Sequence, residues 1–212
     1  MSFIPKVLII AGSDSGGGAG IQADIKTTSY FNGYAMTAIT AITAQNTIGV
    51  QSIYPLPKEI VMEQINSITT DLSPDIVKIG MLADLDIIEY ISKKISNYKI
   101  VLDPVMVATS GDVLVSDEVV SSIKNNLINK SFLITPNIYE AEILSENKIN
   151  CLEDQIEAGK NLLKLGCKHV LVKGGHGNSD VINDVLITSS GDEYIFESKK
   201  IISKNTHGTG CS

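Results

Sequence analysis

The chain carries a glycine-rich turn at residues 205–211, with the sequence NTHGTGC. Two glycines in such a turn let backbone N–H groups converge on one negative group, and a helix beginning after the turn adds partial positive charge. The turn therefore predicts an anion hole at Gly208, Thr209 and Gly210. Cys211 would lie at its mouth, where a helix N-terminus favours the thiolate form of a cysteine. The alternative is that Cys211 is only a small apolar residue at the start of a helix.

Other residues that could do chemistry follow short apolar runs typical of buried strands. Asp103 follows the run 99–102 (KIVL), and Lys173 ends the run 169–173 (HVLVK). In open α/β sheets, ligands bind beyond the carboxyl ends of the strands. The segments that directly follow predicted strands are therefore candidates for a ligand site, and they are residues 12–20, 45–46, 80–81, 103–112, 135–140 and 173–176.

Several familiar ways of holding a phosphate are excluded by the sequence. All 17 cationic side chains are lysines, so no guanidinium can grip a phosphate through two parallel hydrogen bonds. No segment matches the P-loop pattern G-x-x-x-x-G-K-[ST]. The glycine-rich segment 12–20 does not match the dinucleotide pattern G-x-G-x-x-G, because the third glycine would fall at Ile21. Lysine, a metal ion or backbone N–H groups must therefore hold any phosphate.

The composition excludes several classes of protein. The chain has 212 residues, of which 43% are hydrophobic, so it can bury a core and is not a disordered segment. Its net charge of −7 argues against a nucleic-acid-binding surface. No apolar run is long enough to span a membrane, and the N-terminus does not resemble a signal peptide. Three cysteines are too few for a disulfide framework, and an odd number cannot all pair within the chain. We therefore expect a reduced, cytoplasmic protein.

The elements that must position these residues can be read from hydrophobic patterning. Buried strands are predicted at residues 6–11, 35–44, 75–80, 99–102, 132–135 and 169–173. Helices are predicted at residues 21–31, 57–70, 84–96, 116–127, 138–144 and 152–165. The face of the first helix is expected to contain Ile21, Ile25 and Thr28. Residues 181–202 read as a β-hairpin that turns at 190–192 (SGD).

Alternation of strands with helices indicates βαβ units. The fold class expected is therefore α/β, with a mostly parallel central sheet flanked by helices on both faces. No linker or change of composition divides the chain, so residues 1–212 are expected to form a single domain. No internal repeat is visible.

Seven segments occur in the same order as in a known family. They are AGSDSGGGAGIQAD, TAQNT, KIGML, LDPVMVATSGD, TPNIYEAE, LVKGGH and NTHGTGC. In these segments the chain resembles the hydroxymethylpyrimidine/phosphomethylpyrimidine kinases of thiamine biosynthesis, which belong to the ribokinase-like superfamily. The resemblance extends over nearly the whole chain and implies a ribokinase-like fold. Relatives of this type extend further at the C-terminus, so it also implies that the C-terminal helices of the family are missing from these 212 residues.

The resemblance implies which residues enclose the pyrimidine. The matching positions are Gly12, Asp24, Gln45, Met81 and Val105. Gln45 offers a hydrogen-bond donor and an acceptor side by side, as does the edge of an aminopyrimidine. Without the resemblance, Asp24 would read better as a solvated residue on the first helix, and Met81 as a core residue.

The resemblance also implies how the nucleotide is held. Asp103 and Glu140 match the metal region, and their hard oxygens suit Mg²⁺. Asn137 lies in the same phosphate and metal region, and Lys173 matches a nucleotide-phosphate contact. The turn at 208–210 matches the anion hole, and Cys211 stands where sugar kinases of the superfamily place an aspartate base.

The activity implied is phosphorylation of 4-amino-5-hydroxymethyl-2-methylpyrimidine and its monophosphate, with ATP and Mg²⁺ as cofactors. One alternative is a pyridoxal or pyridoxine kinase of the same superfamily. Gln45 follows the pyrimidine branch, and the loop 107–112 lacks the second cysteine that many pyridoxal kinases similar to this branch carry. The other alternative is a non-catalytic pyrimidine-binding module.

The partners expected are therefore the small pyrimidine substrate and ATP, without nucleic acid or membrane. Relatives of this branch are commonly dimers, so a homodimer is an expectation that only the resemblance supplies.

Overall fold

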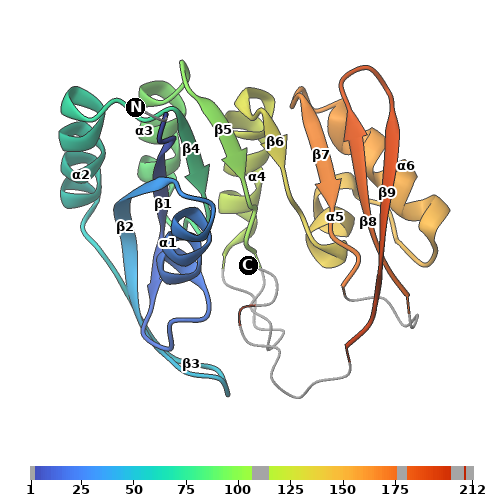
Figure 1. Cartoon of the computed structure of the whole chain (residues 1–212), viewed down its shortest axis with the longest axis horizontal. Helices are drawn as coiled ribbons and strands as arrows, with labels where there is room; N and C mark the ends of the chain where they lie inside the picture. The colour runs from blue at the N-terminus through green and yellow to red at the C-terminus, as the bar shows by residue number, and fades with distance from the viewer. Residues whose placement is uncertain (1–2, 107–114, 176–180, 202–207, 209–212) are drawn as a thin grey trace.

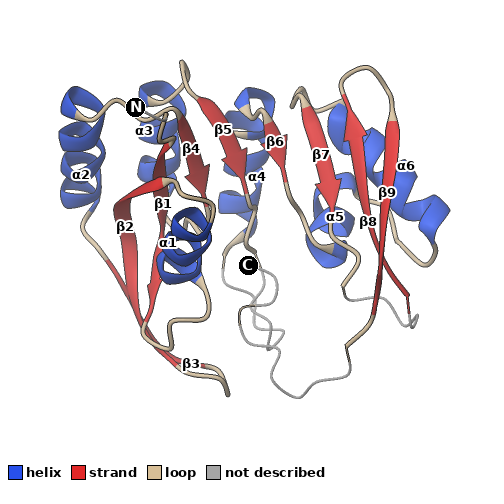
Figure 2. Cartoon of the chain, viewed as in Figure 1, coloured by secondary structure: helices blue, strands red, loops and turns tan. Residues whose placement is uncertain are grey.

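The computed structural model describes residues 3–106, 115–175, 181–201 and 208 of the chain. Strands and helices alternate along most of this part (Figures 1 and 2). The strands are β1 (Lys6–Asp14), β2 (Tyr34–Gln45), β3 (Val50–Pro55), β4 (Ile76–Ile79), β5 (Lys99–Leu102), β6 (Leu133–Ile134), β7 (His169–Val172), β8 (Val181–Thr188) and β9 (Glu193–Lys199). The helices are α1 (Gly20–Tyr30), α2 (Lys58–Asp71), α3 (Leu85–Lys94), α4 (Asp117–Asn126), the short 3₁₀ turn η1 (Ile128–Lys130), α5 (Ile138–Ser145) and α6 (Leu152–Leu163).

All the described strands join one sheet in the order β3-β2-β1-β4-β5-β6-β7-β8-β9. The pairs from β2 through β7 are parallel, whereas β3 at one edge and the hairpin β8–β9 at the other run antiparallel to their neighbours. The carboxyl ends of the central strands therefore meet along one edge of the sheet, the lower edge in Figure 1. This confirms the predicted α/β fold with a mostly parallel sheet.

Alternation along the strands divides the buried side chains between two faces. On β1, Leu8 and Ile10 belong to a large core, whereas Ile9 and Ala11 belong to a small cluster with Ile21 of α1. The large core takes its helical side chains from α2, α3, α4, α5 and α6. Figure 1 shows α1 in front of the sheet and α3, α4 and α6 behind it, so helices lie on both faces.

Capping residues explain where two of the helices begin. The Asp84 carboxylate accepts the N–H of Ile87 at 2.9 Å and so caps α3, which carries two lysines in its last turn. An acceptor at the N-cap satisfies one of the free N–H groups of the first turn, and C-terminal cations complement the helix dipole. Asn137 caps α5 in the same way, with consequences for the site described below.

Three predictions of local structure were wrong. Residues 12–14 continue β1 instead of beginning a loop, because their backbone stays paired with β2 as far as Asp14 and Thr43. Strand β3 was not predicted; its side chains are largely exposed, so its sequence has no apolar run. On α1, Ile25 is exposed and the buried residues are Ile21, Ala23 and Asp24, so the face that packs against the sheet is not the face that contains Ile25.

The helices of the described residues are all too short or too polar to cross a membrane. Two cysteines are described, and both have free thiols: Cys151 is exposed and Cys167 is buried.

Candidate active site

Backbone pairing past the strand ends sets out a row of residues at the carboxyl edge. Gly80 donates its N–H to Ile10, and Asp103 donates to Ile79, each at 2.9 Å. Two further bonds of this kind, from Thr135 to Leu102 at 2.9 Å and from Lys173 to Pro136 at 2.8 Å, continue the row. The residues that immediately follow β4, β5, β6 and β7 are thereby held side by side.

An ion pair joins two members of this row. The Lys173 ammonium lies 2.9 Å from Asp103 Oδ1, and the Thr135 hydroxyl donates to the same oxygen at 3.1 Å. The Asp103 side chain is almost fully buried, and that of Lys173 is about three-quarters buried. The structure therefore brings together two residues that the sequence assigned separately, one to metal and one to nucleotide phosphate.

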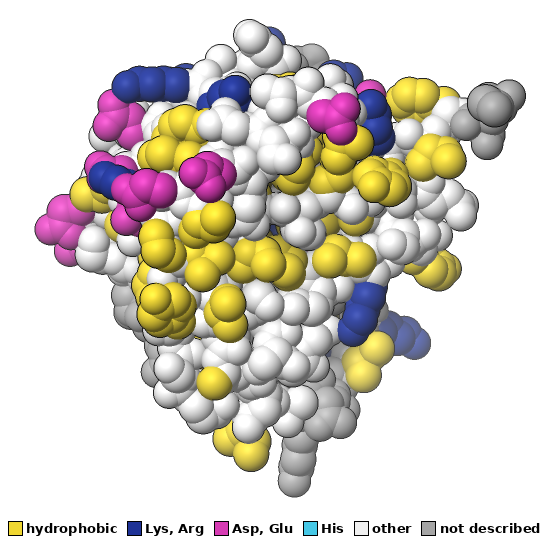
Figure 3. Space-filling model, turned by 90° about the vertical axis from the view of Figure 1, so that its left-hand side faces the viewer, with side chains coloured by type: hydrophobic (Ala, Val, Ile, Leu, Met, Phe, Trp, Pro, Cys, Tyr) yellow, Lys and Arg dark blue, Asp and Glu magenta, His cyan; other side chains and the backbone are white. Residues whose placement is uncertain are grey.

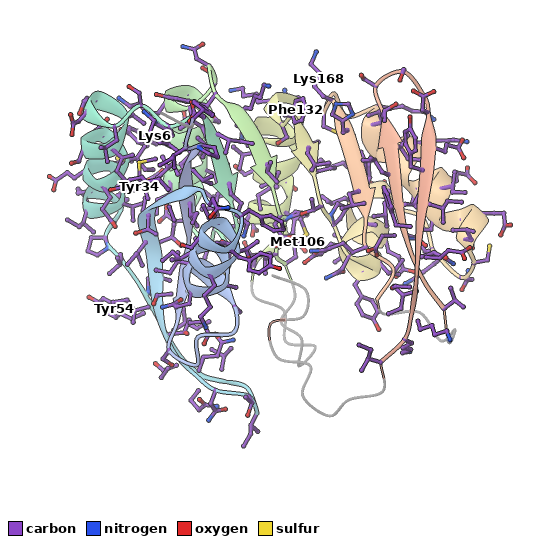
Figure 4. The ribbon with its side chains drawn as sticks, viewed as in Figure 1. Lys6, Tyr34, Tyr54, Met106, Phe132 and Lys168 are labelled. Carbon is purple, nitrogen blue, oxygen red and sulfur yellow. The ribbon has the colours of Figure 1, made fainter. Side chains whose placement is uncertain are left out.

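Glu140 lies beside this pair, in a reciprocal capping box. The Asn137 side chain accepts the Glu140 N–H at 3.0 Å, and Glu140 Oε2 accepts the Asn137 N–H at 2.9 Å. Glu140 Oε1 accepts the N–H of Met106 at 3.3 Å. Met106 lies just past the carboxyl end of β5 (Figure 4). The glutamate thus ties the start of α5 to the segment that follows β5.

Burial dominates the electrostatics of Glu140. Only 2% of the residue is exposed. The pKa of Glu140 is raised to about 7, mainly by desolvation and also by the nearby negative charge of Asp103, whereas its backbone hydrogen bonds and Lys173 oppose the rise. The two carboxylates repel each other, and a divalent cation bound between them would reduce this repulsion. Their oxygens are ligands that such a cation prefers. No group of three or more His, Cys, Asp or Glu side chains forms a metal cluster within the described ranges.

Lys78 is a largely buried charged residue that the sequence reasoning missed. It lies within the apolar strand β4, and its ammonium lies 2.8 Å from Asp24 Oδ2 on α1. Asp24 is 8% exposed, so the reading of this residue as a solvated helix position is wrong. The signal in the sequence is a single lysine inside the apolar run 75–80 (DIVKIG).

The glycine-rich segment after β1 is organised around Asp14. Its carboxylate accepts the N–H groups of Gly16, Gly18 and Ala19 at 2.7, 2.9 and 2.8 Å. These N–H groups are therefore directed at the protein's own carboxylate and not at a phosphate. The segment is held by these bonds between β1 and α1.

Gly208 packs against this glycine-rich segment. Its φ is +77°, and a Cβ built on it would lie 1.9 Å from the carbonyl oxygen of Gly18. The predicted anion hole thus begins beside the glycine-rich segment, although the two lie far apart in sequence. Thr209, Gly210 and Cys211 lie outside the described residues.

The predicted pyrimidine-binding residues lie at the same edge. A Cβ built on Gly12 would lie 3.3 Å from Met81 Cε, so these two residues are in contact. Gln45 ends β2, where its backbone exchanges hydrogen bonds with the Ser15 hydroxyl at 2.7 and 2.8 Å. Val105 follows Asp103 closely, and its N–H donates to the Asp103 carbonyl at 2.8 Å.

The side chain of Gln45 is held in one orientation. The single hydroxyl proton of Thr43 is shared between two acceptors, the Ser13 carbonyl oxygen at 2.9 Å and Gln45 Oε1 at 3.1 Å. This leaves the Gln45 amide nitrogen as the donor that the side chain offers to a ligand.

The protein-family model described as phosphomethylpyrimidine kinase matches residues 14–212 of the chain. A curated relative from Bacillus subtilis, named hydroxymethylpyrimidine/phosphomethylpyrimidine kinase, is 48% identical over 99% of this chain and 78% of its own length. A relative of the same name from Escherichia coli is 44% identical over 98% of this chain and 79% of its own length.

Solved structures agree with this fold. A phosphomethylpyrimidine kinase from Clostridium difficile 630 is 40% identical, with a TM-score of 0.84 over 96% of this chain and 88% of that chain. A pyridoxal kinase from Staphylococcus aureus in complex with ADP is 32% identical, with a TM-score of 0.90 over 99% of this chain and 77% of that chain. The match to the family model and the similarity over nearly the whole length show that the chain belongs to the phosphomethylpyrimidine kinase family.

Proposed function

We propose that this chain transfers the γ-phosphoryl group of ATP to the hydroxymethyl oxygen of 4-amino-5-hydroxymethyl-2-methylpyrimidine, and in a second reaction to the phosphate of the monophosphate. The observation that carries the proposal is the Lys173–Asp103 ion pair beside Glu140, at the ligand-binding edge of the sheet. Phosphoryl transfer needs positioning and charge neutralisation more than covalent chemistry from the protein. In a chain without arginine, Lys173 would supply one positive charge at this edge, and the two carboxylates would contribute by holding Mg²⁺.

The nucleotide phosphates would be held from two sides. Lys173 supplies a point charge, and its pairing with Asp103 keeps the ammonium in place. Asp103 and Glu140 are the residues that would hold Mg²⁺, which binds through one or two carboxylates together with substrate phosphates. When bound, Mg²⁺ would neutralise charge on the phosphates. Asn137 fixes the Glu140 backbone through the capping box and so positions this carboxylate.

The pyrimidine would be enclosed by the residues at the ends of β1, β2 and β4. Gly12 and Met81 form an apolar contact that suits one face of a ring. The Gln45 amide nitrogen would donate to the pyrimidine edge, because Thr43 already donates to the Gln45 oxygen. Val105 and Asp24 complete this proposed enclosure.

The acceptor oxygen would be activated at the glycine-rich turn. Backbone N–H groups of residues 208–211 would stabilise the transferred phosphoryl group, as preorganised donors do at developing negative charge. Cys211 would assist the deprotonation or the orientation of the hydroxymethyl group. The position of Gly208 against Gly18, in the segment that follows β1, supports this assignment.

A homodimer in the cytoplasm, without a nucleic-acid or membrane partner, is also part of the proposal. Exposed apolar side chains at the β2–β3 end of the sheet support a protein interface there (Figure 3). Ile42 on β2 and Ile53 and Tyr54 on β3 are 50%, 41% and 64% exposed. Sedimentation equilibrium of the purified chain tests the dimer, and a monomer at micromolar concentration would contradict it.

The deciding experiment is a product assay with ATP and Mg²⁺ on three substrates in turn: hydroxymethylpyrimidine, its monophosphate and pyridoxal. We expect mono- and diphosphorylated pyrimidine, with a kcat/KM far below these for pyridoxal. Turnover of pyridoxal alone would favour the second kinase activity, for which the similarity to pyridoxal kinases speaks. Binding of the pyrimidine without turnover would favour a non-catalytic module.

A further inference from the structure

Lys78 occupies an unusual place for a charged side chain. It is the only charged residue of the four-residue strand β4, whose other members are isoleucine and valine. Val77 and Ile79 point into the large core behind the sheet. Side chains alternate along a strand, so Lys78 lies on the front face, which α1 covers.

The ion pair that Lys78 makes is largely buried. The side chains of Lys78 and Asp24 are 17% and 9% exposed, and their charged atoms are 2.8 Å apart. Taking two charges out of water costs about as much as their attraction returns, so such a pair is a poor device for stability alone. Buried charged residues with perturbed pKa values cluster at functional sites, so this pair is a candidate for a role in ligand binding.

Close packing places the Lys78 ammonium directly beside residues of the proposed pyrimidine enclosure. A Cβ built on Gly80 would lie 3.2 Å from Lys78 Nζ and 3.0 Å from the Ala11 Cβ. Gly80 is followed by Met81, and Ala11 is followed by Gly12, the two residues that contact each other. The absence of a side chain at Gly80 thus provides the space into which the ammonium fits.

We propose that Lys78 is a positioning residue of the acceptor site, whose ammonium holds the Asp24 carboxylate charged and in a fixed orientation toward the pyrimidine. The inference rests on the proposed function, because it takes Asp24 as a residue that contacts the acceptor. Lys78 acts through Asp24. A second Lys–Asp pair, Lys173–Asp103, lies further along the same edge and serves the phosphates.

The charges around Asp24 agree with this role. Burial raises the pKa of the Asp24 carboxyl, the Lys78 ammonium opposes the rise through its charge and its hydrogen bond, and the Asp103 carboxylate adds to it. Among the residues that the structure describes, Lys78 from β4 and Asp103 from the end of β5 are the charged groups that act on Asp24 from neighbouring elements. Without Lys78, burial and the Asp103 charge would both raise the pKa of Asp24, and the main interaction that lowers this pKa would be lost.

The experiment compares Lys78→Met with the wild-type enzyme in full steady-state kinetics from pH 5 to 9, with ATP and Mg²⁺. We expect the KM for the pyrimidine to rise by about tenfold or more, because removal of one partner leaves an uncompensated buried charge. The acid limb of kcat/KM should move up by about one pH unit or more, since an opposite charge at this distance lowers a carboxyl pKa by that amount. The KM for ATP should stay within about twofold of wild type.

Two further variants separate positioning from structure. Lys78→Arg keeps the charge and should return the acid limb toward the wild-type pH. Lys124→Met is the matched control. Lys124 lies on α4, away from the carboxyl edge, and its ammonium lies 2.6 Å from the Glu146 carboxylate. This control should change neither the pyrimidine KM nor the pH profile.

The proposal is overturned if Lys78→Met lowers the melting temperature but leaves the pyrimidine KM and the acid limb unchanged. Should Lys78→Met fail to fold, Asp24→Asn replaces it, because this variant keeps the shape of the side chain. A wild-type pyrimidine KM in Asp24→Asn would equally sink the proposal. Wild-type enzyme that binds the pyrimidine by calorimetry but transfers no phosphoryl group would refute the proposed function instead. The affinity of Lys78→Met for the pyrimidine would then still test Lys78.

Discussion

Glu140 on α5 accepts the backbone N–H of Met106, 34 residues earlier in the chain, at 3.3 Å. Its second carboxylate oxygen accepts the N–H of Asn137, the cap of its own helix. One buried side chain thus fixes the start of α5 against the segment that follows β5 and Asp103. The position of the carboxylate and the order of the local backbone depend on the same two bonds.

The first prediction concerns the pH dependence of stability. The pKa of Glu140 is about 7 in the folded chain, against an ordinary value of 4.5. The folded state therefore binds more protons between these values, so the stability that Glu140 contributes is present below about pH 4.5 and is lost as the pH rises to about 7. Glu140→Gln removes this titration. Chemical denaturation of both proteins should show that the wild type loses stability relative to Glu140→Gln across this window; a constant difference would contradict the assignment.

The second prediction concerns divalent cations. Asp103 and Glu140 repel each other at the carboxyl edge, and no arginine is present to neutralise a triphosphate. Activity should disappear in excess EDTA and return with added Mg²⁺. Glu140→Gln should lower kcat much more than it lowers the affinity for the pyrimidine, measured by calorimetry. Full turnover in EDTA would rule out the metal assignment.

The third prediction concerns recognition of the pyrimidine by Gln45. Gln45→Leu keeps the size of the side chain but removes the amide that Thr43 orients. A site built to bind a polar edge leaves groups unpaired when one partner is lost, which costs about 1–3 kcal/mol. Calorimetry should show this loss for the pyrimidine and an unchanged affinity for ATP. As the control, Gln51→Leu alters an exposed glutamine near the start of β3, and it should affect neither ligand.

The fourth prediction concerns the three thiols. Cys167 is buried, and desolvation raises the pKa of its thiol to about 11, so it should react slowest with iodoacetamide. Cys211 should react first, and the pyrimidine should protect it, whereas the exposed Cys151 should react without protection. Cys211→Ala should lose at least about tenfold in kcat, since general-base assistance is typically worth 10²–10⁴. Mass spectrometry of the labelled peptides checks the order, and wild-type turnover of Cys211→Ala would show that the base is another group.

The fifth prediction concerns the junction between the two glycine-rich segments. Gly208→Ala places a Cβ 1.9 Å from the Gly18 carbonyl oxygen, at a φ of +77° that alanine rarely adopts. The turn must move, so kcat should fall by about tenfold or more, as for other losses of an oxyanion donor. The control is Gly49→Ala, which meets no atom within 4 Å and should keep the wild-type rate. Equal activity of both variants would separate Gly208 from the anion hole.

The sequence determined the order of the elements and most of the edge residues. Apolar runs and helical periodicity are local signals, and each buried strand or helix that they predicted is present, with ends shifted by a few residues. The prediction that Asp103 and Lys173 follow strands is confirmed because a strand end is visible in the run that precedes it. Strand β3 was not predicted, because this edge strand buries few side chains and its sequence therefore has no apolar pattern.

Only the tertiary structure decided which of these residues meet. Lys78 and Asp24 are 54 positions apart, and their pairing depends on β1 lying between β2 and β4 while α1 covers the front of the sheet. The same holds for Lys173 with Asp103, 70 positions apart, and for Gly208 against Gly18. The local pattern of apolar residues predicts that a strand is buried, but it does not predict which strand lies beside it. The charges of this site are therefore present in the sequence, whereas their pairing, burial and shifted pKa values arise from the order of the strands in the sheet.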